Sequence, residues 1–104
     1  MVPLFAYGTL KRPHIQEALI GRLLDGEADV LEGYRKTTVT LSDQVYPDIV
    51  VDSESRVEGL VVYVTSRELA IMDRYEDTDY IRFEVILASG RSAWVYQALR
   101  TRRK

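Results

Sequence analysis

The apolar positions of this chain fall mostly into short runs that are typical of buried strands. The first run, from Val2 to Tyr7, stops at Gly8 and predicts a strand that enters a loop. Residues 56–64 are rich in valine and predict another strand. Residues 80–89 alternate apolar and polar side chains, which predicts a strand ending in a hairpin turn at Ser89-Gly90. Further strands are expected over residues 28–34, with Gly33 as a candidate bulge, and over residues 37–41, 49–51 and 94–99.

Helical spacing of apolar residues occurs in two other segments. Pro13 suits the first turn of a helix, and the helical spacing that follows continues to about Ile20, just before Gly21. Thr65 and Glu68 have the spacing of a capping box, in which a hydroxyl and a carboxylate satisfy the free backbone N–H groups of a helix start. The pattern therefore predicts two short helices.

Two polar segments separate the strands in the middle of the chain. Tyr46-Pro47-Asp48 is expected to interrupt the sheet, and residues 52–55 are expected to form a polar turn. With these breaks, the pattern predicts six or seven strands, two short helices and one hydrophobic core. We therefore expect a β-rich α+β domain.

Length and composition limit the class of protein. The chain has 104 residues, about the length of one ordinary domain, and its 46% apolar and 29% charged residues exclude a disordered composition. No apolar run approaches the ~20 residues that span a membrane, and no signal-peptide pattern is present. The absence of cysteine excludes disulfides, thiolate nucleophiles and cysteine-based metal sites. We expect a single cytoplasmic domain that does not bind membranes.

Charge is distributed unevenly along the chain. The formal net charge is −2, but residues 1–99 carry 10 basic against 16 acidic side chains, because four basic residues lie in the last five positions. A negative body argues against nucleic acid as a partner, since a nucleic-acid face needs clustered Lys and Arg. We assign the domain to residues 1–99 and expect residues 100–104 to form a solvated, poorly ordered basic tail. Contact of this tail with nucleic acid or an acidic partner is the alternative.

Several kinds of site are excluded by the residues present. The six glycines form neither of the common phosphate-binding patterns, and the acidic residues 73–79 lack the glycine and the distant glutamate of a calcium loop. The single histidine, His14, stands beside Pro13 at a helix start, where we expect a solvated surface position rather than a catalytic base. No metal or cofactor site is predicted.

Two segments retain a candidate function. Tyr7-Gly8-Thr9-Leu10 follows a buried strand, and its backbone N–H groups can hold a carboxylate or carbonyl oxygen. The alternative is a plain strand-to-helix turn.

Glu76 stands in an acidic cluster at the end of the second helix, where negative charge is unfavourable by ~0.3–1 kcal/mol. A carboxylate near apolar and aromatic walls has a raised pKa and can act as a general base and then as an acid. The alternative is an acidic, solvated helix end.

Taken in order, these segments resemble the γ-glutamylcyclotransferase-like family, which includes γ-glutamylamine cyclotransferase and AIG2-like proteins. The resemblance extends over nearly the whole chain. The matching pieces are Leu4–Lys11 with its YGTL loop, Tyr46-Pro47 with the strand after it, Val57–Tyr63, Met72–Glu76 with Tyr80 and Arg82, and Trp94–Tyr96. The family often has glycine after its catalytic glutamate, where this chain has Asp77.

The resemblance implies a small, closed or nearly closed, mixed β-barrel with two short helices packed outside. It also implies an enzyme that converts a γ-glutamyl amine or γ-glutamyl peptide to 5-oxoproline and a free amine, without a metal or cofactor. The catalytic general acid/base falls on Glu76. The substrate-binding residues are Tyr7, Gly8, Thr9 and Leu10. Pocket roles for Tyr80 and Tyr96 stay open, and Arg82 is expected to pair with Glu84 or with a substrate carboxylate. A non-catalytic small-ligand binding domain on the same fold is the alternative.

Overall fold

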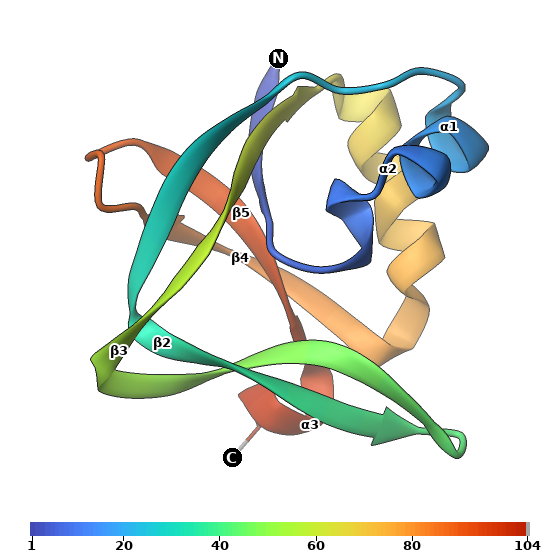
Figure 1. Ribbon diagram of the computed structural model, residues 1–104. Helices are drawn as coiled ribbons and strands as arrows, with labels where there is room; N and C mark the ends of the chain where they lie inside the picture. The colour runs from blue at the N-terminus through green and yellow to red at the C-terminus, as the bar shows by residue number, and fades with distance from the viewer. Residues whose placement is uncertain (104) are drawn as a thin grey trace.

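A computed structural model describes residues 1–103 and shows one curled, five-stranded sheet (Figure 1). The strand order is β2-β3-β1-β5-β4. The strands are β1 (Val2–Ala6), β2 (Gly26–Leu41), β3 (Gln44–Val64), β4 (Tyr80–Ile86) and β5 (Ser92–Ala98). Central β1 is antiparallel to β3 and parallel to β5, so the sheet is mixed. The predicted α+β barrel-like architecture is confirmed, and the curl forms a half-barrel with edges at β2 and β4.

The helices lie outside the curl. They are α1 (Pro13–Ile20), α2 (Ser66–Glu76) and α3 (Leu99–Arg102), with 3-10 turns η1 (Thr9–Lys11) and η2 (Asp77–Asp79). α1 and α2 lie together on one side of the sheet (Figure 1). Their predicted ends are confirmed: α1 stops at Gly21 with a φ of +73°, and Thr65 and Glu68 form the capping box of α2. No helix in residues 1–103 has the length and the apolar character needed to cross a membrane.

Two long strands replace several of the short strands that the pattern predicts. β2 and β3 form one antiparallel hairpin, whose turn at Ser42-Asp43 has positive φ at both residues. The predicted interruption at Tyr46-Pro47-Asp48 is wrong, because Pro47 pairs with Thr38 inside the hairpin. β2 pairs with one side of β3, and β1 pairs with the opposite side only at residues 60–64. The side of β3 that faces away from β2 is therefore free at Pro47. A proline without an N–H group is tolerated at such an edge.

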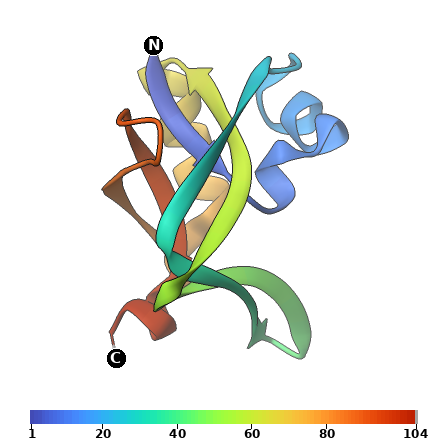
Figure 2. The ribbon, with the colours of Figure 1, turned by 60° about the vertical axis from the view of Figure 1, so that its left-hand side comes forward.

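The hairpin bends where its register shifts. The shift lies between Glu32 and Tyr34, and Gly33 between them has a φ of +85°, which confirms the candidate bulge. Residues 52–55 bulge opposite, and the Asp52 carboxylate accepts hydrogen bonds from two groups of this segment. The expected polar turn is therefore a bulge inside β3, which continues as a strand through residues 52–55. Beyond it, the far half of the hairpin bends away from the rest of the sheet (Figure 2).

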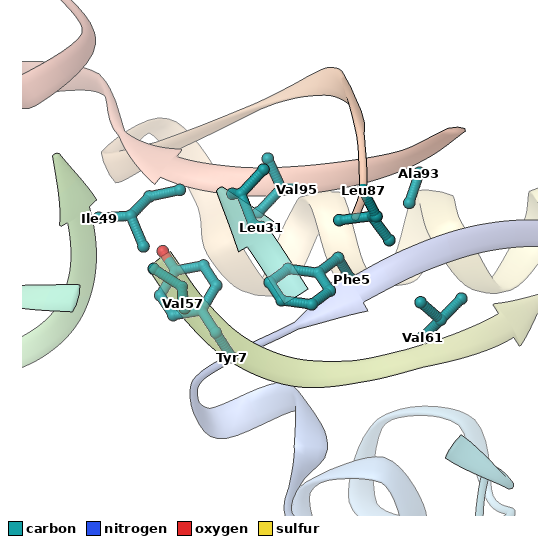
Figure 3. Close-up of a cluster of buried hydrophobic side chains, with 9 residues drawn as sticks. All are labelled: Phe5, Tyr7, Leu31, Ile49, Val57, Val61, Leu87, Ala93 and Val95. Carbon is teal, nitrogen blue, oxygen red and sulfur yellow. The ribbon is translucent and has the colours of Figure 1, made fainter. Parts of the chain in front are cut away.

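Alternation along β1 divides the core between the two faces of the sheet. Phe5 and Tyr7 point into the curl, whereas Leu4 and Ala6 face the helices. The inner cluster consists of Phe5, Tyr7, Leu31, Ile49, Val57, Val61, Leu87, Ala93 and Val95 (Figure 3). The cluster beneath the helices consists of Leu4, Ala6, Leu10, Val62, Val64, Leu69, Met72 and Tyr96. Each cluster reaches the end of β1, where the candidate loop begins.

The C-terminal segment differs from the predicted tail. Residues 99–102 form α3, and the Thr101 hydroxyl donates to the buried Asp48 carboxylate at 2.6 Å. The Arg102 guanidinium lies 3.7 Å from the ring centre of Phe83. Residues 100–102 therefore pack against the sheet, beyond the expected end of the domain at residue 99. Lys104 lies outside the described residues.

Candidate functional site

The loop after β1 is anchored at both ends by buried side chains. The Tyr7 side chain packs into the inner cluster, and its hydroxyl donates to the Tyr96 carbonyl at 2.6 Å. Leu10 packs into the cluster beneath the helices. The backbone of the intervening Gly8 and Thr9 is left half-buried. The strand and the two hydrophobic clusters thus hold the loop, here called loop 7–10, in one position.

Loop 7–10 presents backbone donors without using them internally. The carbonyls of Gly8 and Thr9 accept from the N–H groups of Lys11 and Arg12. The N–H groups that open such a 3-10 turn have no partner within it. A Cβ at Gly8 would lie 3.2 Å from the Pro47 Cβ, so glycine permits the close approach of β3 to the loop. Pro47 thus forms the wall opposite loop 7–10, and the role of the loop as a donor stays a prediction.

Glu76 lies in the last turn of α2 and shares a cavity with loop 7–10. This inner cavity has a volume of about 30 Å³. Its lining consists of Phe5, Ala6, Tyr7, Gly8, Thr9, Leu10, Pro47, Glu76 and Tyr96. The structure therefore brings together all five residues predicted for the site, although the loop and the glutamate lie far apart in the sequence.

The environment of Glu76 changes its proton affinity. Burial raises the pKa of Glu76 to about 7, and the negative charge of Asp73 adds to the effect. A carboxyl group with this pKa exchanges protons readily near neutral pH, as a general acid/base must. Burial and neighbouring carboxylates also raise the pKa of Tyr7, Tyr80 and Tyr96, so these phenols stay protonated.

Asp73 organises a polar network beside the inner cavity. Its carboxylate accepts from the Tyr96 hydroxyl at 2.6 Å and from two nitrogens of Arg82, at 2.8 and 3.0 Å. The Arg82 guanidinium lies 4.4 Å from the ring centre of Trp94. Arg82 therefore pairs with Asp73, and the expected pairing with Glu84 is wrong. Tyr96, whose role was open, lines the cavity and is held by this network.

The sequence gives one signal for this network, the spacing of Asp73 and Glu76, and does not reveal its other members. Asp73 and Glu76 are three residues apart, which places both on one side of a helix. Arg82 and Tyr96 are directly opposed between β4 and β5, and only the strand register reveals this. Sequence reasoning also missed Asp48, whose carboxylate accepts from the Ala98 N–H at 2.9 Å and so ties β3 to the end of β5.

A second, larger hollow adjoins the inner cavity. This outer hollow has a volume of about 200 Å³ and shares Thr9 and Glu76 with the inner cavity. Its lining consists of Thr9, Leu41, Tyr46, Tyr75, Glu76, Asp79 and Tyr80. The Tyr80 hydroxyl donates to the Pro47 carbonyl at 2.5 Å, which fixes its ring. Glu76 is thus a wall common to the small inner cavity and to the wider outer hollow, which three tyrosines line.

Asp77 and His14 line neither the inner cavity nor the outer hollow. Asp77 is exposed and ends α2 with φ +56° and ψ −146°, a backbone conformation that favours glycine. His14 is exposed, as expected. Within residues 1–103, no three His, Asp or Glu side chains are grouped so as to hold a metal ion.

Comparison with known proteins places the chain in a family. The sequence model of the family described as gamma-glutamyl cyclotransferase, AIG2-like, matches residues 4–104. The chain belongs to this family. The positive φ of Asp77 gives a physical reason for the glycine that the resemblance implies at this position.

Curated AIG2-like relatives are longer than this chain. AIG2-like protein C of Arabidopsis thaliana is 36% identical over 80 residues, which cover 76% of this chain and 45% of the relative. AIG2-like protein D of the same plant is 28% identical over 86 residues, which cover 82% of this chain and 55% of the relative. The chain therefore spans about half the length of the curated relatives that it matches.

Solved structures share the fold. The solution structure of the Arabidopsis thaliana protein At5g39720.1 has a TM-score of 0.80 and 24% identity, with 96% of this chain and 70% of that chain covered. A structure named gamma-glutamyl cyclotransferase has a TM-score of 0.77 and 15% identity, with 93% of this chain and 66% of that chain covered. At these identities the likeness concerns the fold alone.

Proposed function

We propose that this protein is a γ-glutamyl cyclotransferase that converts a γ-glutamyl amine or γ-glutamyl peptide to 5-oxoproline and a free amine. The observation that carries the proposal is the shared inner cavity: Glu76, with a pKa of about 7, and loop 7–10 line it together. Family membership supports a cyclotransferase-type activity. The reaction needs no metal and no cofactor.

The proposed chemistry moves protons between two nitrogens of the substrate. The α-ammonium group must lose a proton before its nitrogen can attack the γ-carbonyl, and Glu76 accepts it. A bond forms between the α-nitrogen and the carbon of the γ-carbonyl group, and the bond from that carbonyl carbon to the leaving nitrogen then breaks. The α-nitrogen loses two protons overall, and the departing amine gains two and leaves as an ammonium. Glu76 returns to its starting state.

Loop 7–10 supplies the electrostatic part of the proposed mechanism. Attack places negative charge on the carbonyl oxygen, and preorganised backbone N–H groups stabilise such an oxyanion. The attack is intramolecular, so the protein mainly has to hold the substrate in a folded, near-attack shape. Buried anchors at Tyr7 and Leu10 keep the donors fixed while this happens.

Release of 5-oxoproline from a panel of γ-glutamyl amines and γ-glutamyl peptides tests the proposal. Glu76→Gln keeps the shape of the side chain and removes the proton acceptor, so we expect kcat to fall by about 10²–10⁴-fold. Glu84→Gln, at an exposed position on β4, is the matched control and should retain activity. Full activity of Glu76→Gln would contradict the assigned role.

A non-catalytic ligand-binding domain is the second candidate function. One observation favours it: the inner cavity is small, about 30 Å³, and so encloses part of a ligand rather than a whole γ-glutamyl unit. Calorimetric titration with 5-oxoproline and with a γ-glutamyl amide distinguishes the two candidates. Binding of the intact amide without any product release supports a binding domain.

A further inference from the structure

The proposed function does not assign the amine half of the substrate. The outer hollow indicates where this half binds. The leaving nitrogen receives its proton from Glu76, so it must lie beside that carboxyl group. Loop 7–10 and its donors occupy the inner side of Glu76. The outer hollow adjoins the inner cavity, and the two share Glu76 and Thr9. The outer hollow is therefore the space beside Glu76 that is available to the amine half of the substrate.

The walls of the outer hollow are aromatic. Three tyrosines contribute to it, Tyr46, Tyr75 and Tyr80, together with the apolar side chain of Leu41. The hydroxyl hydrogens of two of them are already used, since Tyr80 donates to the Pro47 carbonyl and Tyr46 donates to the Gln44 side chain. These two residues therefore offer a ligand their rings. The negative faces of aromatic rings attract cations.

The charges lining the outer hollow are all acidic. Asp79 and Glu76 line it, and no Lys, Arg or His among residues 1–103 does so. Asp79 takes part in no salt bridge within these residues. The basic side chains of Arg12 and Lys36 line a different groove, which has only Tyr46 in common with the outer hollow. A carboxylate on the amine half would lie beside Asp79, unpaired and repelled.

We propose that the outer hollow selects an amine half that carries a second cationic group and no carboxylate, as in a γ-glutamyl diamine, with Asp79, Tyr46 and Tyr75 as its specificity-determining residues. This inference rests on the proposed cyclotransferase function. It separates two substrate classes, because the amino acid released from a γ-glutamyl peptide carries a carboxylate and a diamine does not.

Three substrates with the same chain length test this selection. They are the γ-glutamyl amides of 1,4-diaminobutane, butylamine and 4-aminobutyrate, whose free ends are cationic, neutral and anionic. We expect kcat/KM to be highest for the diamine, about tenfold above butylamine, and lowest for the 4-aminobutyrate amide. Equal values, or preference for the anionic substrate, would overturn the proposal.

The variants test whether Asp79 is the source of the preference. Asp79→Asn should bring the diamine-to-butylamine ratio of kcat/KM close to one, and Tyr75→Leu should lower it. A ratio within one variant is insensitive to partial unfolding, since both substrates meet the same protein. Asp77→Asn is the matched control, because Asp77 is exposed and does not line the outer hollow, and it should keep the wild-type ratio. An unchanged ratio in Asp79→Asn rejects the assignment.

A binding measurement keeps this inference separate from the proposed function. If neither the three amides nor the γ-glutamyl peptides of the panel release 5-oxoproline, the cyclotransferase proposal fails. Binding of free 1,4-diaminobutane and of butylamine to the wild-type chain, followed by NMR at Tyr75 and Tyr80, then decides the cation preference alone. Tighter binding of the diamine that Asp79→Asn removes supports the outer hollow as a cation site, and equal binding of the two amines refutes it.

Discussion

At the scale of a single residue, Glu76 lies where a charged carboxylate is doubly disfavoured. It stands at the C-terminal end of α2, where the helix dipole opposes negative charge, and it is largely buried beside Asp73. Both factors favour the protonated form. A side chain placed for stability alone would not need this arrangement, whereas a group that accepts and returns a proton does.

The raised pKa of Glu76 makes folding stability depend on pH. The pKa is about 7 in the folded state and 4.5 as the reference value, so the contribution of this group is fully present below about 4.5. It is lost as pH rises through about 7, because the folded state then has to ionise a buried carboxyl. We expect Glu76→Gln to be more stable than wild type at about pH 9 and to lose that advantage towards about pH 4.5. Urea unfolding at both pH values measures the difference, and Glu84→Gln should show no such trend.

Removing the charge of Asp73 and removing the charge of Arg82 should shift the pKa of Glu76 in opposite directions. Asp73→Asn removes the negative charge that raises the Glu76 pKa and leaves Arg82 without its partner, so the Glu76 pKa should fall. Arg82→Gln leaves the Asp73 charge uncompensated, so the Glu76 pKa should rise. NMR titration of the Glu76 carboxyl carbon in each variant measures both shifts without relying on activity. Shifts of the same sign would contradict the network described here.

At the scale of the element, the end of α2 carries conformational strain. Asp77 has φ +56° and ψ −146°, a region essentially restricted to glycine, which costs of order 1–3 kcal/mol for other residues. Asp77→Gly removes this strain but gains freedom in the unfolded chain, worth about 0.5–1 kcal/mol. We expect a net stabilisation of about 1 kcal/mol, or a rise in Tm of about 4–8 °C. Asp77→Ala keeps a Cβ and should not stabilise, and thermal melts of the two variants separate strain from loss of charge.

The elements predicted well are those whose signals are local. The capping box at Thr65 and the hairpin turn at Ser89-Gly90 need only neighbouring residues, and both are present in the structure. The break predicted at Tyr46-Pro47 failed because proline is excluded from central strands but not from a free edge, and edges are set by the sheet as a whole. α3 was missed for the same reason, since its contacts with Asp48 and Phe83 join distant parts of the chain.

The candidate site shows the same division. Loop 7–10 and Glu76 could be named because each lies in a contiguous segment with a recognisable sequence. Their meeting in one cavity, and the pairing of Arg82 with Asp73, depend on how β4 and β5 return along β1. The site residues could therefore be predicted where they lie in contiguous segments of sequence. The long-range interactions that change the pKa of Glu76 could not.

At the scale of the whole molecule, the half-barrel is held in its curl by contacts between strands that are not neighbours in the sheet. Asp29 on β2 is buried and accepts hydrogen bonds from the Ser89 hydroxyl at 2.6 Å and from Arg91 Nε at 2.9 Å. The Ala88 N–H donates to the Val30 carbonyl beside it at 2.8 Å. The β4–β5 turn is thereby fastened to the edge strand β2. Here this set of contacts, formed by Asp29, Val30, Ala88, Ser89 and Arg91, is called the clasp.

The clasp should contribute to stability in a pH-dependent way. Burial opposes ionisation of Asp29, but hydrogen bonds from Ser89 and Val30 and the charge of Arg91 outweigh it, so the Asp29 pKa is lowered. A carboxyl group whose pKa is lowered by folding stabilises the folded state at pH values above its ordinary, unfolded-state pKa. This contribution is lost as pH falls through the folded-state pKa. Asp29→Ala should therefore destabilise by about 1.5–3 kcal/mol near neutral pH, the range for a hydrogen bond to a charged group, and by less in acid. Glu32→Ala, an exposed acid on the same strand, is the control for general charge effects. If urea unfolding gives the same loss for Asp29→Ala at both pH values, the ionised carboxylate is not what closes the curl.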